Sequence, residues 1–435
     1  MNMQLLKRLP LTTLSFAALF LTCFQGTLFA ATASSVERFG VTWTFDRAYE
    51  VGQFANGDWW VLGPVTITEI SPASVDDKNG SMINPALNKN LAFDTRMQRD
   101  TFDAEANVAT QLPLKVTKPS SILSAISLVE DTTRDNPQLD TISILTVLTE
   151  KPAAGSFRPP YQGDDKTILG NKADLNYDIL RKLEPVEGAP EDLVALAEKF
   201  DRPYIELKLG WTGRYTHPKS NQPAYGRELA HRLGYGLLAL QLNVPDEQKE
   251  ALYINLVQIG IDIYGAARLG GKWNADGGHN QGRKMPMLLA GLALDNKEIL
   301  KYANAEAYMI FQEDQQTFYV EQKHVDTPRR EIRNRRLDPY TPEMIGKAEW
   351  GIRNYNEPDR SGSNWGAYYR TVSGAPTITH VLVAHLMGVE EIWNHPPLFE
   401  YYDRYFEVES EPEVRKGKGT NGIQTFTLNM WNAYR

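Results

Sequence analysis

Residues 269–284, which read LGGKWNADGGHNQGRK, combine residue types that could do chemistry. Five glycines are interleaved with a tryptophan, an aspartate, a histidine and three amide side chains, between two strongly apolar helical patterns. Glycine lets the backbone adopt conformations that other residues resist. The fold is therefore free to aim His279, Asn280 and Gln281, and we predict that this segment is a functional loop.

The sequence lacks the motifs of several common chemistries. It has no HExxH, paired-histidine or Cys–His spacing, which argues against a dedicated zinc site. It has no GxSxG elbow, and its single cysteine, Cys23, lies near the N-terminus, so familiar acyl-transfer nucleophiles lack support. The GGHNQG run has neither the spacing nor the Ser/Thr of a phosphate-binding loop. Sugar chemistry, by hydrolysis or by elimination, remains.

Elimination on a uronic acid has defined requirements. Amide, imidazole or guanidinium donors must neutralise the carboxylate before the C5 proton becomes acidic. A base then removes that proton and an acid protonates the leaving oxygen. Tyrosine can do both where nearby cations lower its pKa. The chain offers such groups in separate loops: Asn221, His279 with Asn280 and Gln281, Arg336 with Tyr340, and Arg353 with Tyr355.

Each candidate also has a structural interpretation. His279 could hydrogen-bond loop backbone, and Asn221 could cap the helix that follows it. Tyr340, between two prolines, could be a packing aromatic, and Trp350 could belong to the core instead of stacking on a sugar. Other tyrosines compete for the role of base, namely Tyr355, Tyr368 and Tyr369.

Charge favours an anionic substrate over nucleic acid. The formal net charge is −8, and an acidic surface argues against nucleic acid as a partner. Five arginines nevertheless fall within eight residues of this acidic chain: Arg329, Arg330, Arg333, Arg335 and Arg336. Runs of charged residues are often solvated, but guanidinium groups also pair well with planar carboxylates.

The N-terminus has the pattern of an export signal. Lys7 and Arg8 precede an apolar run that is too short to span a bilayer, and small residues follow it. We predict that residues 1–33 are a cleaved signal peptide, with cleavage between Ala30 and Ser34. The protein is then exported, periplasmic or secreted, without membrane attachment after cleavage. The mature chain then contains no cysteine and no disulfide.

Two domains are expected, because about 400 residues exceed what one core usually serves. Residues 34–150 contain short β-branched and aromatic runs separated by turn signals, which predict a β-rich N-terminal domain, most simply an antiparallel sandwich. Residues 151–170 are rich in proline and glycine and predict a linker or crossing strap.

The remainder, residues 171–435, has helical periodicity. Consecutive helices favour antiparallel pairs, and closing such pairs into a ring gives an (α/α)n toroid or barrel. The expected fold class is therefore mainly α, with a toroid catalytic domain beside the β-rich region. Residues 312–371 break the pattern and predict a long functional loop region. The predicted helices cover 173–183, 190–200, 225–242, 246–269, 285–294, 297–311, 378–387 and 397–406.

Three segments, WNADGGHNQGRKMP, GKAEWGIRNYNEPDRSGSNWGAYYR and YGRELAHRLGYGLLALQLN, resemble polysaccharide lyases of the α/α-toroid type. The family that the chain resembles most is polysaccharide lyase family 38, whose members act on glucuronan or alginate. The resemblance implies that an asparagine and a histidine neutralise the carboxylate, with a tyrosine and an arginine on a later loop. Order and approximate spacing carry these roles to Asn221, His279, Tyr340 and Arg336.

The sequence therefore predicts a polysaccharide lyase that cleaves glucuronan or alginate by β-elimination, with no metal or other cofactor. The first alternative is an inverting glycoside hydrolase that uses Asp276 and Glu349, because hydrolysis needs two carboxyl groups flanking the bond. The second is a non-catalytic protein that binds an acidic polysaccharide through Trp350 and the arginines. The expected substrate-binding residues are Asn280, Gln281, Arg283, Trp350, Arg353 and Tyr355.

Overall fold

The computed structural model describes residues 31–97, 102–129, 138–210, 213–221, 226–327, 331–332, 335–336, 339–351, 373–408 and 423–435. The predicted signal peptide lies outside these residues, except for Ala31 to Ala33. These three residues open strand β1 (Ala31–Arg38), which pairs antiparallel with β2. Cleavage directly after Ala30 would therefore leave β1 whole.

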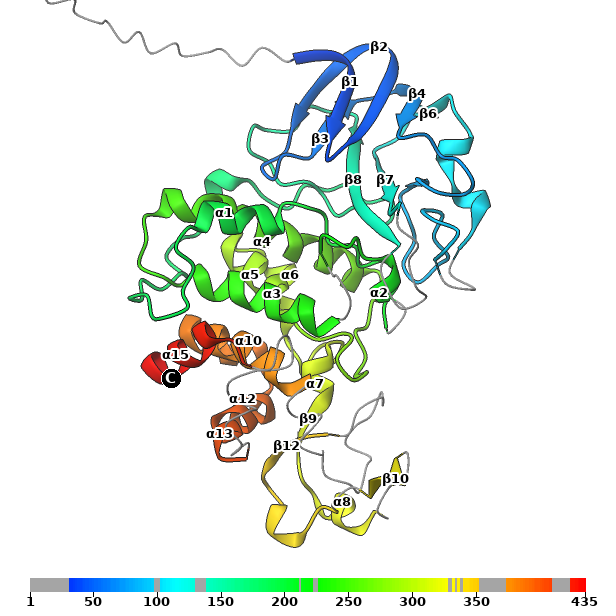
Figure 1. The fold of residues 1–435 in the computed structure, drawn as a ribbon. Coiled ribbons are helices and arrows are strands. Elements are labelled where there is room, and N and C mark those ends of the chain that lie inside the picture. The colour runs from blue at the N-terminus through cyan, green and yellow to red at the C-terminus, as the bar shows by residue number, and fades with distance from the viewer. Residues whose placement is uncertain are drawn as a thin grey trace, which may run out of the picture.

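The N-terminal region is β-rich, as predicted, and forms a curled eight-stranded sheet (Figure 1). In β2, the side chains of Val41, Trp43 and Phe45 are buried and alternate with more exposed ones, as expected for a strand with one buried face. Strands β3 and β8 run parallel, so the described strands form one mixed sheet in place of the expected antiparallel sandwich. The further strands are β2 (Val41–Gln53), β3 (Trp59–Leu62), β4 (Val65–Ser71), β5 (Ser81–Ile83), β6 (Leu114–Val116), β7 (Ser120–Ser127) and β8 (Leu139–Leu148), in the order β5-β7-β8-β3-β2-β4-β6 with β1 on β2.

Residues 151–170, the predicted linker, form an irregular strap that joins the sheet to helix α4 (Asp246–Arg268). The fully buried Arg158 donates from Nε to Asp58 Oδ2 at 2.7 Å and from Nη2 to Asp262 Oδ2 at 2.5 Å. Asp58 directly precedes β3, and Asp262 lies in α4. One guanidinium therefore holds the two parts of the molecule together. Lys166 Nζ folds back on three carbonyl groups of the strap.

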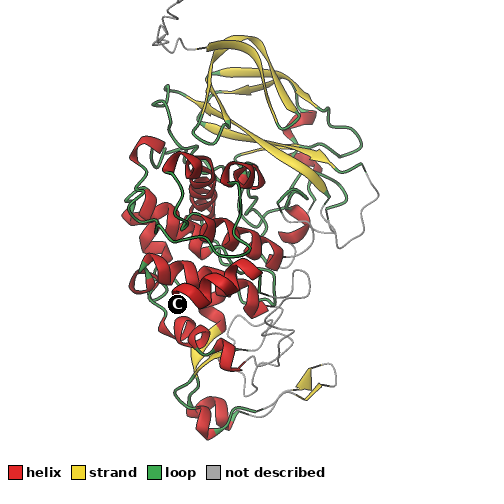
Figure 2. Ribbon diagram, turned by 60° about the vertical axis from the view of Figure 1, so that its left-hand side comes forward, coloured by secondary structure: helices red, strands yellow, loops and turns green. Residues whose placement is uncertain are grey.

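The helical part follows the predicted pattern in most segments (Figure 2). The predictions over 190–200, 225–242, 246–269, 285–294, 378–387 and 397–406 are confirmed to within a few residues. The apolar faces of these helices form one large core, in which α4 packs on α5 and α3 packs on α10. The helices are α1 (Leu193–Ala197), α2 (Gly213–Thr216), α3 (Gly226–Ala239), α4, α5 (Lys284–Ala293), α6 (Lys297–Ala303), α7 (Gln312–Gln316), α8 (Gln322–Asp326), α10 (Ala375–Met387), α11 (Glu390–Trp393), α12 (Pro396–Asp403), α13 (Tyr405–Val408) and α15 (Thr425–Tyr434).

The expected fold class, mainly α with an (α/α)n toroid, is wrong. The structure has 37% helix and 21% strand, with a curled mixed sheet, and is a mixed α and β fold. The helix predicted over 173–183 is not formed: a 3-10 turn at Lys172–Asp174 is followed by an irregular chain. Leu175 and Leu180 of this chain pack in the helical core. The helix predicted over 297–311 ends at Ala303. Between α6 and α10 the described helices are one turn long, so the succession of helix pairs that a ring requires is interrupted.

An extension projects from the helical part and contains the described residues between 317 and 350 (Figure 1). It includes β9 (Thr317–Tyr319) paired with β12 (Ala348–Trp350), and β10 (Glu331–Ile332) paired with β11 (Arg335–Arg336). Within the described part of the chain, no helix combines the length and the hydropathy that crossing a bilayer would require.

Candidate functional site

The glycine-rich loop, residues 270–283, connects the end of α4 to the start of α5. Its backbone lies against the first turn of α3, where a Cβ placed on Gly226 would lie 1.9 Å from the carbonyl oxygen of His279. Trp273 is fully buried and stacks on Phe311, with ring centroids 5.1 Å apart and planes 7° apart. The loop is therefore packed against the helical core, and the stacking of Trp273 on Phe311 anchors it there.

A buried ion pair holds the C-terminal half of this loop. Arg283 Nε lies 3.1 Å from Glu206 Oε1, and both side chains are nearly inaccessible to solvent. The same guanidinium donates from Nη1 to the carbonyl oxygens of His279 and Gln281, at 3.2 and 2.9 Å. Burial alone would raise the pKa of the Glu206 carboxyl, but the charge of Arg283 leads the interactions that hold it below its ordinary value. Arg283, predicted to bind substrate, is placed to support the loop.

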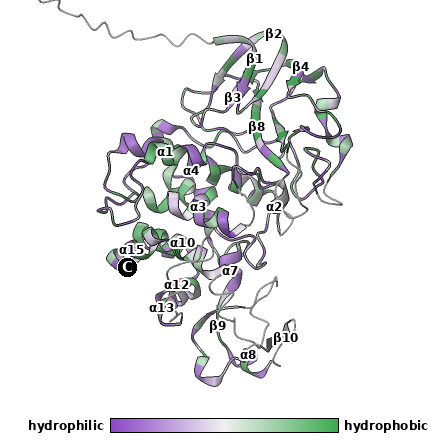
Figure 3. Cartoon of the chain, in the orientation of Figure 1, coloured by the Kyte–Doolittle hydropathy of each residue, from purple (hydrophilic) through white to green (hydrophobic). Residues whose placement is uncertain are grey.

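Helix α7 supports the loop from the other side through glutamine side chains. Gln312 Oε1 accepts from the backbone N–H of Asn280 at 3.0 Å, and its Nε2 donates to the carbonyl oxygen of Gly277 at 2.6 Å. Gln315 Oε1 accepts from the backbone N–H of Ala275 at 2.9 Å. Figure 3 shows α7 as a hydrophilic helix, and yet most of its residues are buried. Two of its glutamines, Gln312 and Gln315, therefore bind the loop instead of water.

His279 is the predicted site residue that this arrangement presents. Its side chain is half-buried, whereas the neighbouring Asn280 and Gln281 are buried. Asn280 Nδ2 donates to the carbonyl oxygen of Asn274 at 2.7 Å, and Gln281 Oε1 accepts from Gln312 Nε2 at 3.3 Å. The two amides thus serve the loop itself, whereas the His279 side chain is partly exposed to solvent.

Asn221 is the last residue of the described stretch 213–221, which follows the stretch 203–210 that contacts the loop through Glu206. Its side chain is buried and donates from Nδ2 to the carbonyl oxygen of Pro203 at 2.5 Å. These stretches also contain Glu206, the partner of Arg283, and the buried His217. The Glu206–Arg283 pair therefore joins this part of the chain to the loop, whereas Asn221 itself binds Pro203.

The remaining predicted site residues are not gathered at the loop. Tyr340 is buried in the extension, where its ring centroid lies 6.1 Å from Phe318 and 5.8 Å from His324. The backbone of Arg336 lies in β11, and its side chain is outside the described residues. Arg353 and Tyr355 are also outside the described residues.

Trp350, predicted to bind substrate, is a core residue. It is fully buried, and its ring centroid lies 5.8 Å from those of Tyr401 and Tyr402 in α12. Burial of this whole indole leaves no face on which a sugar could stack. The next residue, Gly351, is held against α7: its N–H donates to the carbonyl oxygen of Gln316 at 2.6 Å, and its own carbonyl oxygen accepts from Gln316 Nε2 at 2.8 Å.

The carboxyl groups considered for hydrolysis lie in different surroundings. Asp276 is half-buried on the glycine-rich loop. Glu349 is buried in β12 and forms an ion pair with Arg404. A carboxylate engaged in this ion pair is a structural partner, which argues against Glu349 as one of the two carboxyl groups that hydrolysis needs.

Four buried residues in the segments that support the loop were not predicted from the sequence, namely Glu206, His217, Gln312 and Glu313. Burial lowers the pKa of His217 to about 4, which makes this imidazole neutral near the Glu206–Arg283 pair. None of these residues lies in a motif or in a glycine-rich setting. Their importance comes from contacts between segments far apart in the chain, which periodicity does not report.

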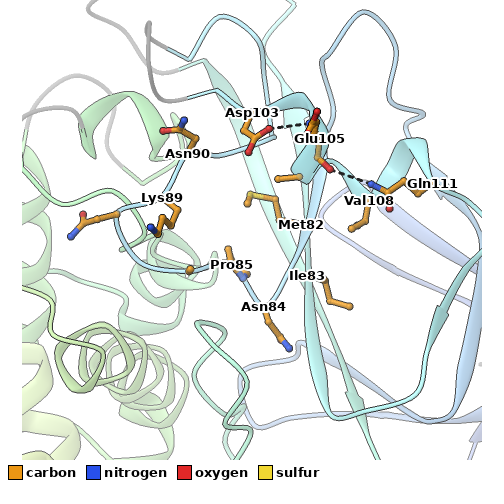
Figure 4. Close-up of a pocket in the computed structure, with 13 residues that line it drawn as sticks. Met82, Ile83, Asn84, Pro85, Lys89, Asn90, Asp103, Glu105, Val108 and Gln111 are labelled. Carbon is orange, nitrogen blue, oxygen red and sulfur yellow. Dashed lines mark hydrogen bonds between the residues drawn. The ribbon is translucent and has the colours of Figure 1, made fainter.

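A pocket of about 610 Å³ lies elsewhere, at the end of the sheet near β5 (Figure 4). It is lined by Met82, Asn90, Asp103 and their neighbours. Two of its polar groups are engaged locally: Asp103 Oδ1 accepts from the N–H of Glu105 at 3.1 Å, and Gln111 Nε2 donates to the Glu105 carbonyl oxygen at 3.2 Å. The pocket contains none of the predicted site residues.

No protein-family model, curated protein or solved structure matches the chain.

Proposed function

We propose that the protein is a polysaccharide lyase that cleaves a uronate-containing polysaccharide, glucuronan or alginate, by β-elimination. One observation carries the proposal: a glycine-rich loop, held by an ion pair and by two glutamines of α7, bears the half-buried imidazole of His279. Catalysis by charge neutralisation requires donors that are fixed before the substrate arrives. A rigid loop with one presented imidazole meets that requirement.

In the proposed reaction, His279 donates to the substrate carboxylate and thereby makes the C5 proton acidic. Asn221, whose amide donates to the carbonyl oxygen of Pro203, is the second proposed donor to that carboxylate. A tyrosine removes the proton and protonates the leaving oxygen. Tyr340 packs in the extension. Gly351 binds α7, the helix that supports the loop, and Tyr355 follows four residues later in the sequence. Tyr355 is therefore the first alternative base to test.

The arginines between 329 and 336 would retain the anionic polymer by charge. The proposed location is the periplasm or the extracellular space, in keeping with the predicted signal peptide and with a polymeric substrate. No metal or other cofactor is proposed, because imidazole, amide and guanidinium donors can neutralise the carboxylate.

The test is ultraviolet absorbance during incubation of the purified mature protein with glucuronan, alginate, pectate and glycosaminoglycans. Elimination creates a double bond conjugated to the carboxylate, so absorbance rises only if a lyase acts. We expect a rise on one polymer, its loss in His279→Ala, and no change in His385→Ala. His385 is a matched control because it is partly exposed on α10 and pairs with Glu390.

Tyr340→Phe and Tyr355→Phe identify the base. Loss of absorbance in one variant and its survival in the other assigns the role. New reducing ends without absorbance would contradict the lyase proposal and favour a hydrolase. The absence of both signals on every polymer would favour a binding protein.

A further inference from the structure

Glu313 is a fully buried carboxyl group in α7, the helix that supports the glycine-rich loop. Within the described part of the chain, neither of its carboxyl oxygens has a hydrogen-bond partner. An ionised carboxylate in such a place is disfavoured, because burial removes its hydration and the backbone N–H groups of Glu313 and Lys284, which favour the charged form, replace that hydration only in part. The uncharged acid is tolerated far better.

The charged neighbour of Glu313 is already engaged with another carboxylate. Lys284, the first residue of α5, donates from Nζ to Asp314 Oδ2 at 2.7 Å. Asp314 also accepts from the indole N–H of Trp393 at 2.6 Å, and Lys284 Nζ donates to the Trp393 carbonyl oxygen at 3.2 Å. The Lys284–Asp314 pair is therefore neutral in total and has its hydrogen bonds without Glu313. Ionisation of Glu313 would give the buried cluster of Glu313, Lys284 and Asp314 a net negative charge.

The other titratable groups around this cluster supply no compensating charge. His395, at the N-cap of α12, has a pKa that burial lowers, so it is neutral at physiological pH. Tyr402 in α12 has a pKa that burial raises well above its ordinary value, so it is neutral as well. Burial and the charge of Asp314 raise the pKa of the Glu313 carboxyl to about 7, although Lys284 opposes the shift. This carboxyl therefore titrates where the protein is expected to work.

Glu313 is coupled to the loop through its neighbours in α7. Gln312 and Gln315 hold the loop at Ala275, Gly277 and Asn280. Gln316 binds Gly351. α7 is one turn long, so a movement that hydrates Glu313 must also move these glutamines. The anchors of the loop and the burial of Glu313 therefore exist together or are lost together.

We propose that Glu313 is a positioning residue: its uncharged carboxyl keeps α7 docked under the glycine-rich loop, and its ionisation releases α7 and disorders the loop that presents His279. The protein thus carries a built-in pH limit at its candidate site. The inference concerns the loop and goes beyond the proposed reaction; only its activity readout rests on the lyase proposal.

The test is hydrogen exchange followed by mass spectrometry on the loop peptide 270–283, from about pH 4.5 to about pH 8.5, with the intrinsic exchange rate corrected. In the wild type we expect protection of this peptide to fall by up to about tenfold for each pH unit between about pH 5 and about pH 7, where opening releases one proton, and to level off above about pH 7, where the carboxyl is ionised in both states. In Glu313→Gln, which cannot ionise, protection should not change with pH. Glu298→Gln, at an exposed carboxylate of α6, should behave as the wild type.

Two results would overturn the proposal: wild-type protection that does not change with pH, or the same fall in Glu313→Gln. If the glutamine variant does not fold, Glu313→Leu removes the same charge, and the wild-type titration decides by itself. Lyase activity, if present, should fall over the same pH range. If no polymer is cleaved at any pH, the exchange result still stands, so the two proposals fail separately.

Discussion

Gly226 and His279, 53 positions apart in the sequence, are in such close contact that a methyl group on Gly226 would lie 1.9 Å from the His279 carbonyl oxygen. The backbone of the first turn of α3 thus forms the floor of the glycine-rich loop. Glycine is required at this position because no other residue leaves room for the loop.

Gly226→Ala should therefore displace the loop while leaving the core of α3 in place. We expect a loss of about 1–3 kcal/mol in the free energy of unfolding, as for an overpacked core site, and a larger loss of lyase activity. The control is Gly374→Ala, where the nearest atom to a new Cβ is 3.5 Å away. Thermal unfolding and the absorbance assay measure the two effects. Unchanged activity in Gly226→Ala would contradict the assignment of the site to this loop.

Gln312→Ala tests the support of the loop from α7. The variant loses the bonds to Asn280, Gly277 and Gln281 and leaves buried loop groups unpaired. Each unpaired buried group destabilises by about 1–3 kcal/mol. We expect faster hydrogen exchange in the loop and a reduced kcat. Gln248→Ala, at an exposed residue of α4, should have neither effect. Equal exchange in both variants would refute the supporting role.

Arg158→Met tests the connection between the sheet and the helices. It leaves Asp58 and Asp262 buried without their cation, and breaking a buried pair in this way destabilises by about 3–5 kcal/mol. Chemical denaturation measures the loss. Lys172→Met removes an exposed ion pair with Glu250 and should change stability by less than about 1 kcal/mol. A similar small change in Arg158→Met would show that the strap does not hold the two parts together.

His217 predicts a pH dependence of stability. Burial lowers its pKa to about 4 from an ordinary value of 6.5. Between about pH 6.5 and about pH 4, His217 is protonated in the unfolded chain but neutral in the folded protein. This histidine therefore lowers the free energy of unfolding by up to about 3 kcal/mol as the pH falls to about 4. The difference in unfolding free energy between the wild type and His217→Asn should therefore shift in favour of the variant at low pH.

The difference between the two proteins isolates His217 from other groups, such as Glu313, whose contributions change in the opposite direction over part of this range. His385→Asn, on the partly exposed surface of α10, is the control. A difference between wild type and His217→Asn that stays constant from about pH 7 to about pH 4 would refute the prediction.

The local elements of this protein could be predicted from its sequence. The periodicity of α3, α4, α5 and α10 is a property of neighbouring residues, so these helices were predicted to within a few residues. The β-rich region was found for the same reason, because β-branched runs and turn signals are local as well. The glycine-rich loop was also recognised from composition alone, since glycines between two apolar helices end both patterns.

The way in which these elements are joined depends on tertiary contacts and could not be predicted. A ring of helix pairs depends on packing between distant helices, and the short α7 and the extension interrupt it. The parallel pairing of β3 with β8 is likewise non-local. At the site, Glu206, Gln312 and Glu313 act through partners 31 to 77 positions away or through burial. Trp350, which resembled a sugar-stacking residue in the sequence, is fully buried because Tyr401 and Tyr402 enclose it. Local patterns predict what a segment is, and burial by distant segments decides what each of its side chains can do.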